Sequence, residues 1–321
     1  MKVLAKILLA IFALFVLGGI GSYFYFRKEF QAPANQLVVS QLPATTPFIW
    51  GATRELPHAV LLVPISVPNC PRTCYFQFDT GAPYTLLTSN ALDVLRAEYP
   101  ATRAALQVRG DSVRNFQFAI GPGQVRARNM RVKAYASIMK LPAHPNEPFI
   151  IGTLGTDVID GRVLTIDYAR MRLTLGSTAP DSLLPRAAFV PMSFKERRLL
   201  LNVGLQGQPK ELMFDTGCSA FSLLTSEGNW QKMARPAATA QTVPVNSWGK
   251  TLTAHTVATA AAMQFGATTV PLGTVSYIEG MGFMQSTLTR FSGMGGMLGN
   301  APFNQQTIIL DVKNGQFGVV K

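Results

Sequence analysis

Cysteine and histidine are scarce in this chain of 321 residues, which contains three of each. His58, His144 and His255 are far apart, and no second cysteine or histidine pair lies at metal-ligand spacing from Cys70 and Cys74. Zinc sites use three or four such ligands, mostly in closely spaced pairs. We therefore expect no metal site, and no motif in the chain indicates a cofactor.

Acidic residues are also few, with 17 Asp and Glu against 29 Lys and Arg, which gives a net charge of +12. The basic residues cluster modestly in residues 103–133 and 195–198. Two interpretations stay open: a solvated surface, or attraction to anionic lipid head groups or acidic substrates. No nucleic-acid-binding motif accompanies the charge, so we expect no nucleic-acid partner.

Charged residues are absent from residues 7–26, which are almost wholly apolar. Twenty residues in a helix cover roughly the ~30 Å of a bilayer core. Basic residues flank this run, with Lys2 and Lys6 before it and Arg27 and Lys28 after it. The pattern predicts a transmembrane signal anchor over residues 1–28.

A cleaved signal peptide is the alternative to this anchor. Arg27 and Lys28 stand where a cleavage region needs small neutral residues, and Ala32-Pro33-Ala34 is a poor and distant cleavage site. We favour the uncleaved anchor in the inner (cell) membrane. The basic residues before the span favour a cytoplasmic amino terminus, which would place the rest of the chain in the periplasm or outside the cell.

Cys70 and Cys74 bracket three residues at the expected tip of a hairpin. A disulfide across this turn is sterically compatible with the spacing, and it would fit an oxidising compartment. Reduced Cys70 and Cys74 in cells would instead favour a topology in which the bulk of the chain faces the cytoplasm.

Two copies of one short motif organise the chain: Phe78-Asp79-Thr80-Gly81 and Phe214-Asp215-Thr216-Gly217. Each copy lies between two apolar runs, which predicts a strand, a sharp turn with an aspartate, and a second strand. Glycine permits the tight backbone and a close approach from the opposite side. Two such turns could bring two carboxylates face to face.

The spacing of further residues indicates an internal duplication. Asp215 follows Asp79 by 136 residues, whereas Gly299 follows Gly155 and Asp311 follows Asp167 by 144 residues each. One insertion of eight residues in the second half reconciles these distances. A constant offset across several elements is typical of duplicated sequences.

The duplicated motifs resemble the aspartic proteases of the pepsin and retropepsin type, in their two-lobed, single-chain form. The segment 154–159 is similar to the bacterial retropepsin-like branch, and the likeness covers residues 58–321. It implies an all-β fold of two homologous lobes with a cleft between them, preceded by the transmembrane helix. We expect a tether over 29–57, lobes over 58–176 and 190–321, and a linker over 177–189.

The resemblance also implies a site and a reaction. Asp79 and Asp215 would form a catalytic dyad that hydrolyses polypeptides with an activated water, and one chain would supply both carboxyls. Eight further residues would support the dyad. They would supply hydrogen bonds across the lobe interface, a close approach of the turns and packing behind them: Thr80, Gly81, Thr216, Gly217, Leu154, Gly155, Leu298 and Gly299.

Three departures from the family pattern affect this expectation. Ala82 and Cys218 stand where many members have Ser or Thr, so we expect a dyad with raised proton affinities and a pH optimum nearer neutral. No flap tyrosine can be named in the first lobe, and the expected flap tips are Arg109-Gly110-Asp111 and Ser247-Trp248-Gly249. Trp248 is a candidate for covering substrate or for ordinary packing. The alternative function is a catalytically silent relative that binds peptides or a partner protein.

Overall fold

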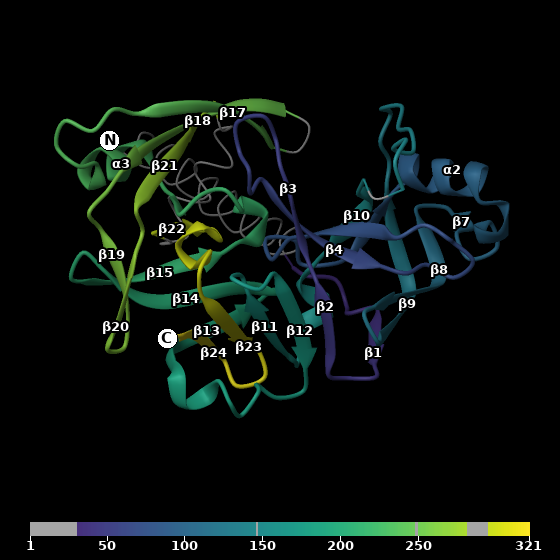
Figure 1. Cartoon of the computed structure of the whole chain (residues 1–321), viewed down its shortest axis with the longest axis horizontal. Coiled ribbons are helices and arrows are strands. Elements are labelled where there is room, and N and C mark those ends of the chain that lie inside the picture. Colours follow the sequence, from purple (N-terminus) through teal and green to yellow (C-terminus); the bar gives the residue numbers. More distant parts are fainter. Residues whose placement is uncertain (1–30, 146, 248–249, 281–294) are drawn as a thin grey trace, which may run out of the picture. The chain divides into compact units, whose positions relative to one another are not determined.

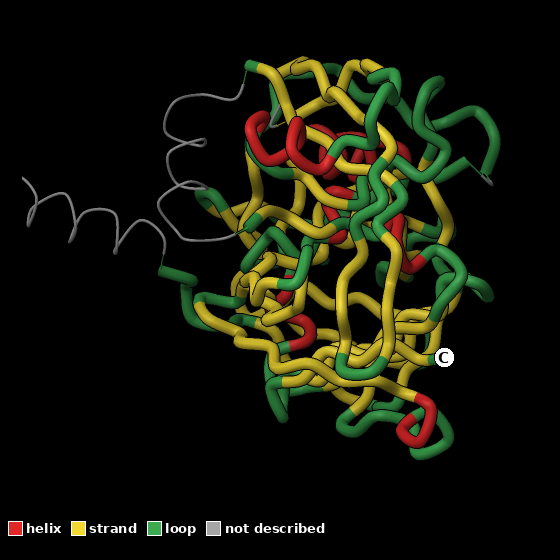
Figure 2. Tube along the Cα trace, turned by 90° about the vertical axis from the view of Figure 1, so that its left-hand side faces the viewer, coloured by secondary structure: helices red, strands yellow, loops and turns green. Residues whose placement is uncertain are grey.

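The structure is a computed structural model, which describes residues 31–145, 147–247, 250–280 and 295–321. Residues Asn35–Lys321 form one compact unit. It consists mostly of strands, at 49% of residues against 12% helix, and Figure 2 shows how short the helical segments are. The predicted all-β class is confirmed at this level.

One sheet contains nine strands among the described residues. Its apolar side chains alternate between buried and less buried positions, as half-covered strands require. The order is β3 (Ile49–Gly51), β4 (Val60–Ile65), β5 (Cys74–Phe78), β10 (Phe149–Leu154), β6 (Leu86–Thr88), β9 (Gly123–Lys133), β8 (Ser112–Ile120) and β7 (Val108–Arg109), with β1 (Leu37–Ser40) paired to β9. Helix α2 (Ser89–Glu98) buries Ala91, Leu92 and Leu95.

The second sheet contains fifteen strands in the described part of the chain. Its order is β17 (Gln241–Ser247), β18 (Lys250–Ala258), β21 (Thr274–Glu279), β16 (Leu223–Leu224), β22 (Gly296–Leu298), β15 (Gln208–Phe214), β14 (Arg198–Leu205), β13 (Ala187–Lys195), β24 (Gln316–Val320), β23 (Thr307–Asp311), β11 (Val163–Asp167), β12 (Arg172–Gly176) and β2 (Ala44–Pro47). Strand β19 (Ala262–Phe265) pairs with β14 and with β20 (Thr268–Pro271). Helix α3 (Glu227–Met233) contacts β21.

The duplication seen in the sequence recurs in the strand pairing. Strand β10 runs parallel to β5 and antiparallel to β6, and β22 runs parallel to β15 and antiparallel to β16. Strands β6 and β16 in turn pair in parallel with β9 and β21. We call β4–β12 the first repeat and β14–β24 the second repeat.

The closing hairpins of the two repeats join side by side within the larger sheet. These hairpins are β11–β12 in the first repeat and β23–β24 in the second. Strands β11 and β23 pair antiparallel from Val163↔Asp311 to Asp167↔Thr307. The two repeats are therefore connected by continuous backbone pairing (Figure 1).

The predicted tether over residues 29–57 is wrong for most of its length. Strands β1, β2 and β3 lie within it, and Leu37, Ala44 and Phe48 are buried. Strand β2 pairs with β12 as β13 pairs with β24, so β2 is the first repeat's counterpart of β13. These strands have only three or four residues, too few to give a sustained period in the sequence.

The predicted linker over residues 177–189 is also too long, because β13 begins at Ala187. A short 3-10 turn, Leu184–Arg186, precedes that strand. The predicted anchor over residues 1–28 lies outside the described residues. Within the described ranges, none of the helices combines the length and the apolar character needed to cross a membrane.

Candidate active site

Asp79 and Asp215 each follow directly on a buried phenylalanine that ends a strand, Phe78 in β5 and Phe214 in β15. The amide of Asp79 donates to Leu154 O at 3.0 Å, and the amide of Asp215 donates to Leu298 O at 2.9 Å. Leu154 and Leu298 are themselves buried. The two Leu-Gly segments thus lie directly behind the two aspartates, as the sequence predicts.

Thr80 and Thr216 connect the two turns by reciprocal hydrogen bonds. The amide of each threonine donates to the other's Oγ1 at 2.9 Å. Each hydroxyl donates across the same interface, Thr80 Oγ1 to Phe214 O and Thr216 Oγ1 to Phe78 O, also at 2.9 Å. Both threonines are buried, so every donor and acceptor in this set is satisfied without water.

Gly81 and Gly217 allow the turns to approach each other. The amide of Gly81 donates to Asp79 Oδ1 at 2.8 Å and to Asp215 Oδ1 at 3.2 Å, and the amide of Gly217 donates to Asp215 Oδ1 at 2.7 Å. A Cβ at Gly81 would lie 2.8 Å from Asp215 Oδ2, and one at Gly217 would lie 2.7 Å from Asp79 Oδ1. The carboxyl of each repeat therefore lies against the turn of the other.

Gly155 and Gly299 lie equally close to the loops that follow the aspartates. A Cβ at Gly155 would lie 2.8 Å from Ala82 O, and one at Gly299 would lie 2.2 Å from Cys218 O. Both backbone contacts exclude any larger residue without movement of the loop. The structure thus brings together all ten residues that the sequence assigns to the dyad and its support.

Burial and the neighbouring Asp215 carboxyl raise the pKa of Asp79 to about 8, and the amides of Gly81 and Ala82 oppose this rise. Asp215 is 8% exposed, and Asp79 is partly exposed. Two carboxyls this close do not both ionise readily, because each negative charge disfavours the other. One proton is therefore retained on the pair at neutral pH.

No protein-family model matches the chain, and no curated protein matches it either.

Cys218 differs from the expectation drawn from the sequence. Its Sγ donates to Asp215 Oδ2 at 3.3 Å. Burial, followed by the Asp215 and Asp79 carboxyls, raises the pKa of the Cys218 thiol well above its usual range, so the thiol stays protonated. The expected loss of a side-chain donor therefore holds at Ala82 and is wrong at Cys218.

Thr85 and Asp157 were not assigned a role from the sequence. Asp157 is buried and accepts from the Thr85 amide at 2.8 Å and from Thr85 Oγ1 at 2.6 Å. Thr85 Oγ1 also accepts from the Gly155 amide at 3.1 Å. Burial raises the pKa of Asp157, and the bonds from Thr85 oppose the rise. This pair fixes the strand after the first aspartate to the Leu154-Gly155 segment.

Arg197, in the turn between β13 and β14, also supports the first turn. Its Nη1 donates to Pro83 O at 3.0 Å, its Nε lies 3.4 Å from Asp160 Oδ2, and its carbonyl accepts from Thr156 Oγ1 at 2.7 Å. A contact in the other direction joins Asn304 Nδ2 of the second repeat to His58 Nδ1, which precedes β4, at 3.2 Å. Residues 160 and 304 differ by the repeat offset of 144.

The second turn has a different buried support. Asn300 Nδ2 donates to Ser219 Oγ at 3.0 Å, and Asn300 Oδ1 accepts from Tyr168 OH at 2.7 Å. Ser219 Oγ donates to Thr216 O at 2.6 Å. The closing hairpin of the first repeat therefore contacts the Asp215 turn of the second repeat through one asparagine.

Of the two predicted flap tips, the structure describes only the first in full. Residues 109–111 form the tip of the short β7–β8 hairpin, with Gly110 at φ 63°. Trp248 would lie at the tip of the long β17–β18 hairpin, but it is outside the described residues, so its role in covering substrate stays a prediction.

Cys70 and Cys74 are free thiols in the structure. Their sulfur atoms both donate to Arg72 O, at 3.4 and 3.8 Å. The Arg72 guanidinium in turn donates to the carbonyls of His144 and Glu147. The hairpin tip thus brings the two thiols to one carbonyl, and the disulfide stays a prediction.

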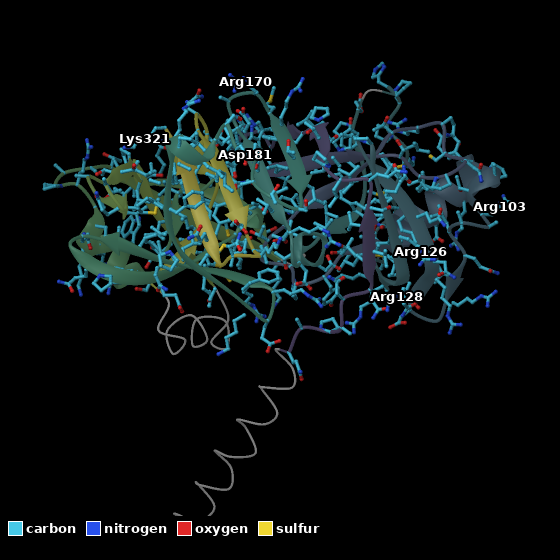
Figure 3. All side chains as sticks on the ribbon, turned by 90° about the horizontal axis from the view of Figure 1, so that it is seen from below. Arg103, Arg126, Arg128, Arg170, Asp181 and Lys321 are labelled. Atoms are coloured by element: carbon cyan, nitrogen blue, oxygen red, sulfur yellow. The ribbon has the colours of Figure 1, made fainter. Side chains whose placement is uncertain are left out.

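Basic residues of segment 103–133 lie on the surface of the first repeat. Arg103, Arg126 and Arg128 are exposed and project from the same repeat in Figure 3. Arg126 and Arg128 both belong to β9.

Proposed function

We propose that the chain is an aspartic endopeptidase that cleaves polypeptides through Asp79 and Asp215. The observation that supports this most is the reciprocal Thr80–Thr216 bonding, which holds two carboxyls against each other's turn. Paired carboxyls with one retained proton supply both a base and an acid for amide hydrolysis. The finer fold in this proposal is two pepsin/retropepsin-like lobes with a cleft between them.

The reaction follows from the dyad. The ionised carboxyl takes a proton from water, the water oxygen attacks the scissile carbonyl carbon, and the protonated carboxyl gives its proton to the carbonyl oxygen. The resulting gem-diol collapses as one hydroxyl returns a proton to the dyad, the C–N bond breaks, and the other carboxyl protonates the leaving nitrogen. Each carboxyl ends in its starting protonation state, and the proposed cycle requires no cofactor.

The test of this function uses the full chain in detergent with a diverse peptide mixture, analysed by mass spectrometry from about pH 3 to 8. Asp79→Asn and Asp215→Asn should both abolish cleavage. Asp181→Asn, a change at an exposed aspartate (Figure 3), is the matched control and should keep it. Cleavage that survives in either dyad variant would contradict the proposal.

A folded chain that cleaves nothing at any pH would instead favour the peptide-binding alternative. In that case wild type should still bind peptides from the mixture, and the dyad variants should retain binding. Circular dichroism and a cooperative melt would establish that the chain is folded.

We also propose that residues 7–26 anchor the enzyme in the inner membrane, with residues 35–321 on the periplasmic side. The support is the uncharged run and its basic flanks. Resistance to alkaline extraction would establish the anchor. An alkylation assay of Cys70 and Cys74 in intact cells would report whether these thiols are oxidised, and reduced thiols would favour the cytoplasmic topology.

A further inference from the structure

The two catalytic turns are near duplicates, but they do not offer their carboxyls the same number of donors. Asp215 accepts from Gly217 N at 2.7 Å, from Gly81 N at 3.2 Å and from Cys218 Sγ at 3.3 Å. Asp79 accepts from Gly81 N at 2.8 Å, and the amide of Ala82 also favours its charged form. The hydrogen bonds therefore stabilise a negative charge more on Asp215 than on Asp79.

The difference arises at one position of the repeated motif. Ala82 and Cys218 each stand three residues after their aspartate. The methyl group of Ala82 cannot donate a hydrogen bond, whereas the protonated thiol of Cys218 donates directly to Asp215 Oδ2. A donor to a carboxylate favours its ionised state.

We propose that Cys218 is a positioning residue that makes the dyad asymmetric, with the negative charge on Asp215 and the proton on Asp79 before substrate is attacked. This inference rests on the proposed function, since it assigns the acid and base roles within the same site.

The assignment specifies each proton transfer. Asp215 takes a proton from water as the water oxygen bonds to the carbonyl carbon, and Asp79 gives its proton to the carbonyl oxygen. In the second step a gem-diol hydroxyl returns a proton to Asp79, the C–N bond breaks, and Asp215 protonates the leaving nitrogen. Asp215 ends charged and Asp79 ends protonated, so the cycle is closed.

The other charged groups of the site do not reverse this asymmetry. Asp157 faces Thr85, and Arg197 faces Asp160 and Pro83. Besides burial, the Asp215 carboxyl and the neighbouring amides determine the pKa of Asp79. Both carboxyls raise the pKa of the Cys218 thiol. The pKa of Asp79, raised to about 8 by burial and by Asp215, agrees with a proton on Asp79 at neutral pH.

The first test does not depend on activity. Carboxyl ¹³C NMR of the aspartate-labelled full chain would follow both carboxyls from about pH 3 to 9. Asp215→Asn and Asp79→Asn identify the two signals by removing one each. We expect the Asp79 signal of wild type to be the second of the two to change, near pH 8. The reverse order, or a single step shared equally, would overturn the inference.

The second test uses pH profiles of kcat/KM with matched variants at the two duplicated positions. Cys218→Ala should move the acidic limb to higher pH by roughly 0.5–1 unit, and Cys218→Ser should move it to lower pH. Ala82→Ser adds a donor beside Asp79 and should lower the alkaline limb instead. A Cys218→Ala profile that moves only at its alkaline limb, or not at all, would contradict the assignment.

The melting temperatures of these variants show whether a limb shift is a structural effect, because loss of packing alone lowers stability without moving one limb selectively. Failure of the proposed function would appear as a folded chain without cleavage, for which the NMR order still decides the asymmetry. Cleavage with the opposite NMR order would refute the inference alone.

Discussion

The backbone amide of Thr80 donates to Thr216 Oγ1, and the amide of Thr216 donates to Thr80 Oγ1, both at 2.9 Å. These buried bonds are related by the internal duplication, and they join segments 136 residues apart. Neither turn can change its position without breaking bonds of the other. The distance between the two carboxyls is therefore controlled by residues other than the two aspartates.

Replacement of either threonine by alanine should leave a buried amide and a buried carbonyl without partners. We expect Thr80→Ala and Thr216→Ala each to lower the free energy of unfolding by roughly 1–3 kcal/mol and to reduce kcat more than KM. Thr80→Ser and Thr216→Ser keep the hydroxyl and are the matched controls. Urea unfolding and peptide kinetics measure both effects, and equal losses in the Ala and Ser variants would contradict the role of the hydroxyl.

Added side chains at the turns should disable the dyad by steric contact. Gly81→Ala places a Cβ 2.8 Å from Asp215 Oδ2, so we expect cleavage to fall to background. Gly228→Ala is the control, because Gly228 lies in α3 with open space around its Cβ position. That change should keep activity and stabilise the helix by up to ~1 kcal/mol. Normal cleavage by Gly81→Ala would show that the turns can separate without harm.

The stability of the protein should depend on the protonation of Asp79. Its pKa is raised in the folded chain to about 8, whereas an aspartate in an unfolded chain titrates near ~3.9. Between these values the folded state binds one more proton, so this contribution to stability is full below pH ~4 and is lost as the pH rises through about 8. Denaturant unfolding at several pH values should show a shallower decline for Asp79→Asn than for wild type. Asp181→Asn should follow wild type.

The same pKa predicts the pH dependence of cleavage. Retention of a proton on the dyad to about pH 8 places the alkaline limb of activity near that value. We expect the optimum to lie nearer neutral pH than in acid-acting relatives of the proposed fold. An optimum below about pH 4, measured with the full chain, would refute this expectation.

The duplicated motifs and their family resemblance were sufficient to identify the two aspartates, their threonines and glycines, and the Leu-Gly segments behind them. These residues occur in short motifs that recur after 136 residues at the aspartate turns and after 144 residues at the Leu-Gly segments. Arg197 and Asn300 could not be found in this way, because their contacts with Pro83 and Tyr168 span 114 and 132 residues and differ between the repeats. The sequence shows a cysteine at position 218, but the hydrogen bond from its thiol to Asp215 depends on the geometry of the turn.

Arg197 provides a test of support that comes from the other repeat. Its side chain is 10% exposed and contacts both Pro83 O and Asp160. Arg197→Ala should cost about 2 kcal/mol of stability and lower kcat, because a charged hydrogen bond to the turn that follows Asp79 is lost. Arg170→Ala removes an arginine that is 78% exposed and should cost little. Equal effects of the two changes would show that the Arg197 contacts do not position the turn.

The folded role of residues 37–51 predicts where the chain can be shortened. A chain that begins at Asn35 keeps β1, β2 and β3, together with the buried Leu37, Ala44 and Phe48. A chain that begins at His58 exposes the edge of β12 and the apolar surface that these side chains cover. We expect the longer chain to melt cooperatively and the shorter one to aggregate or to melt at a clearly lower temperature. Equal melting of the two would show that these strands add nothing to the fold.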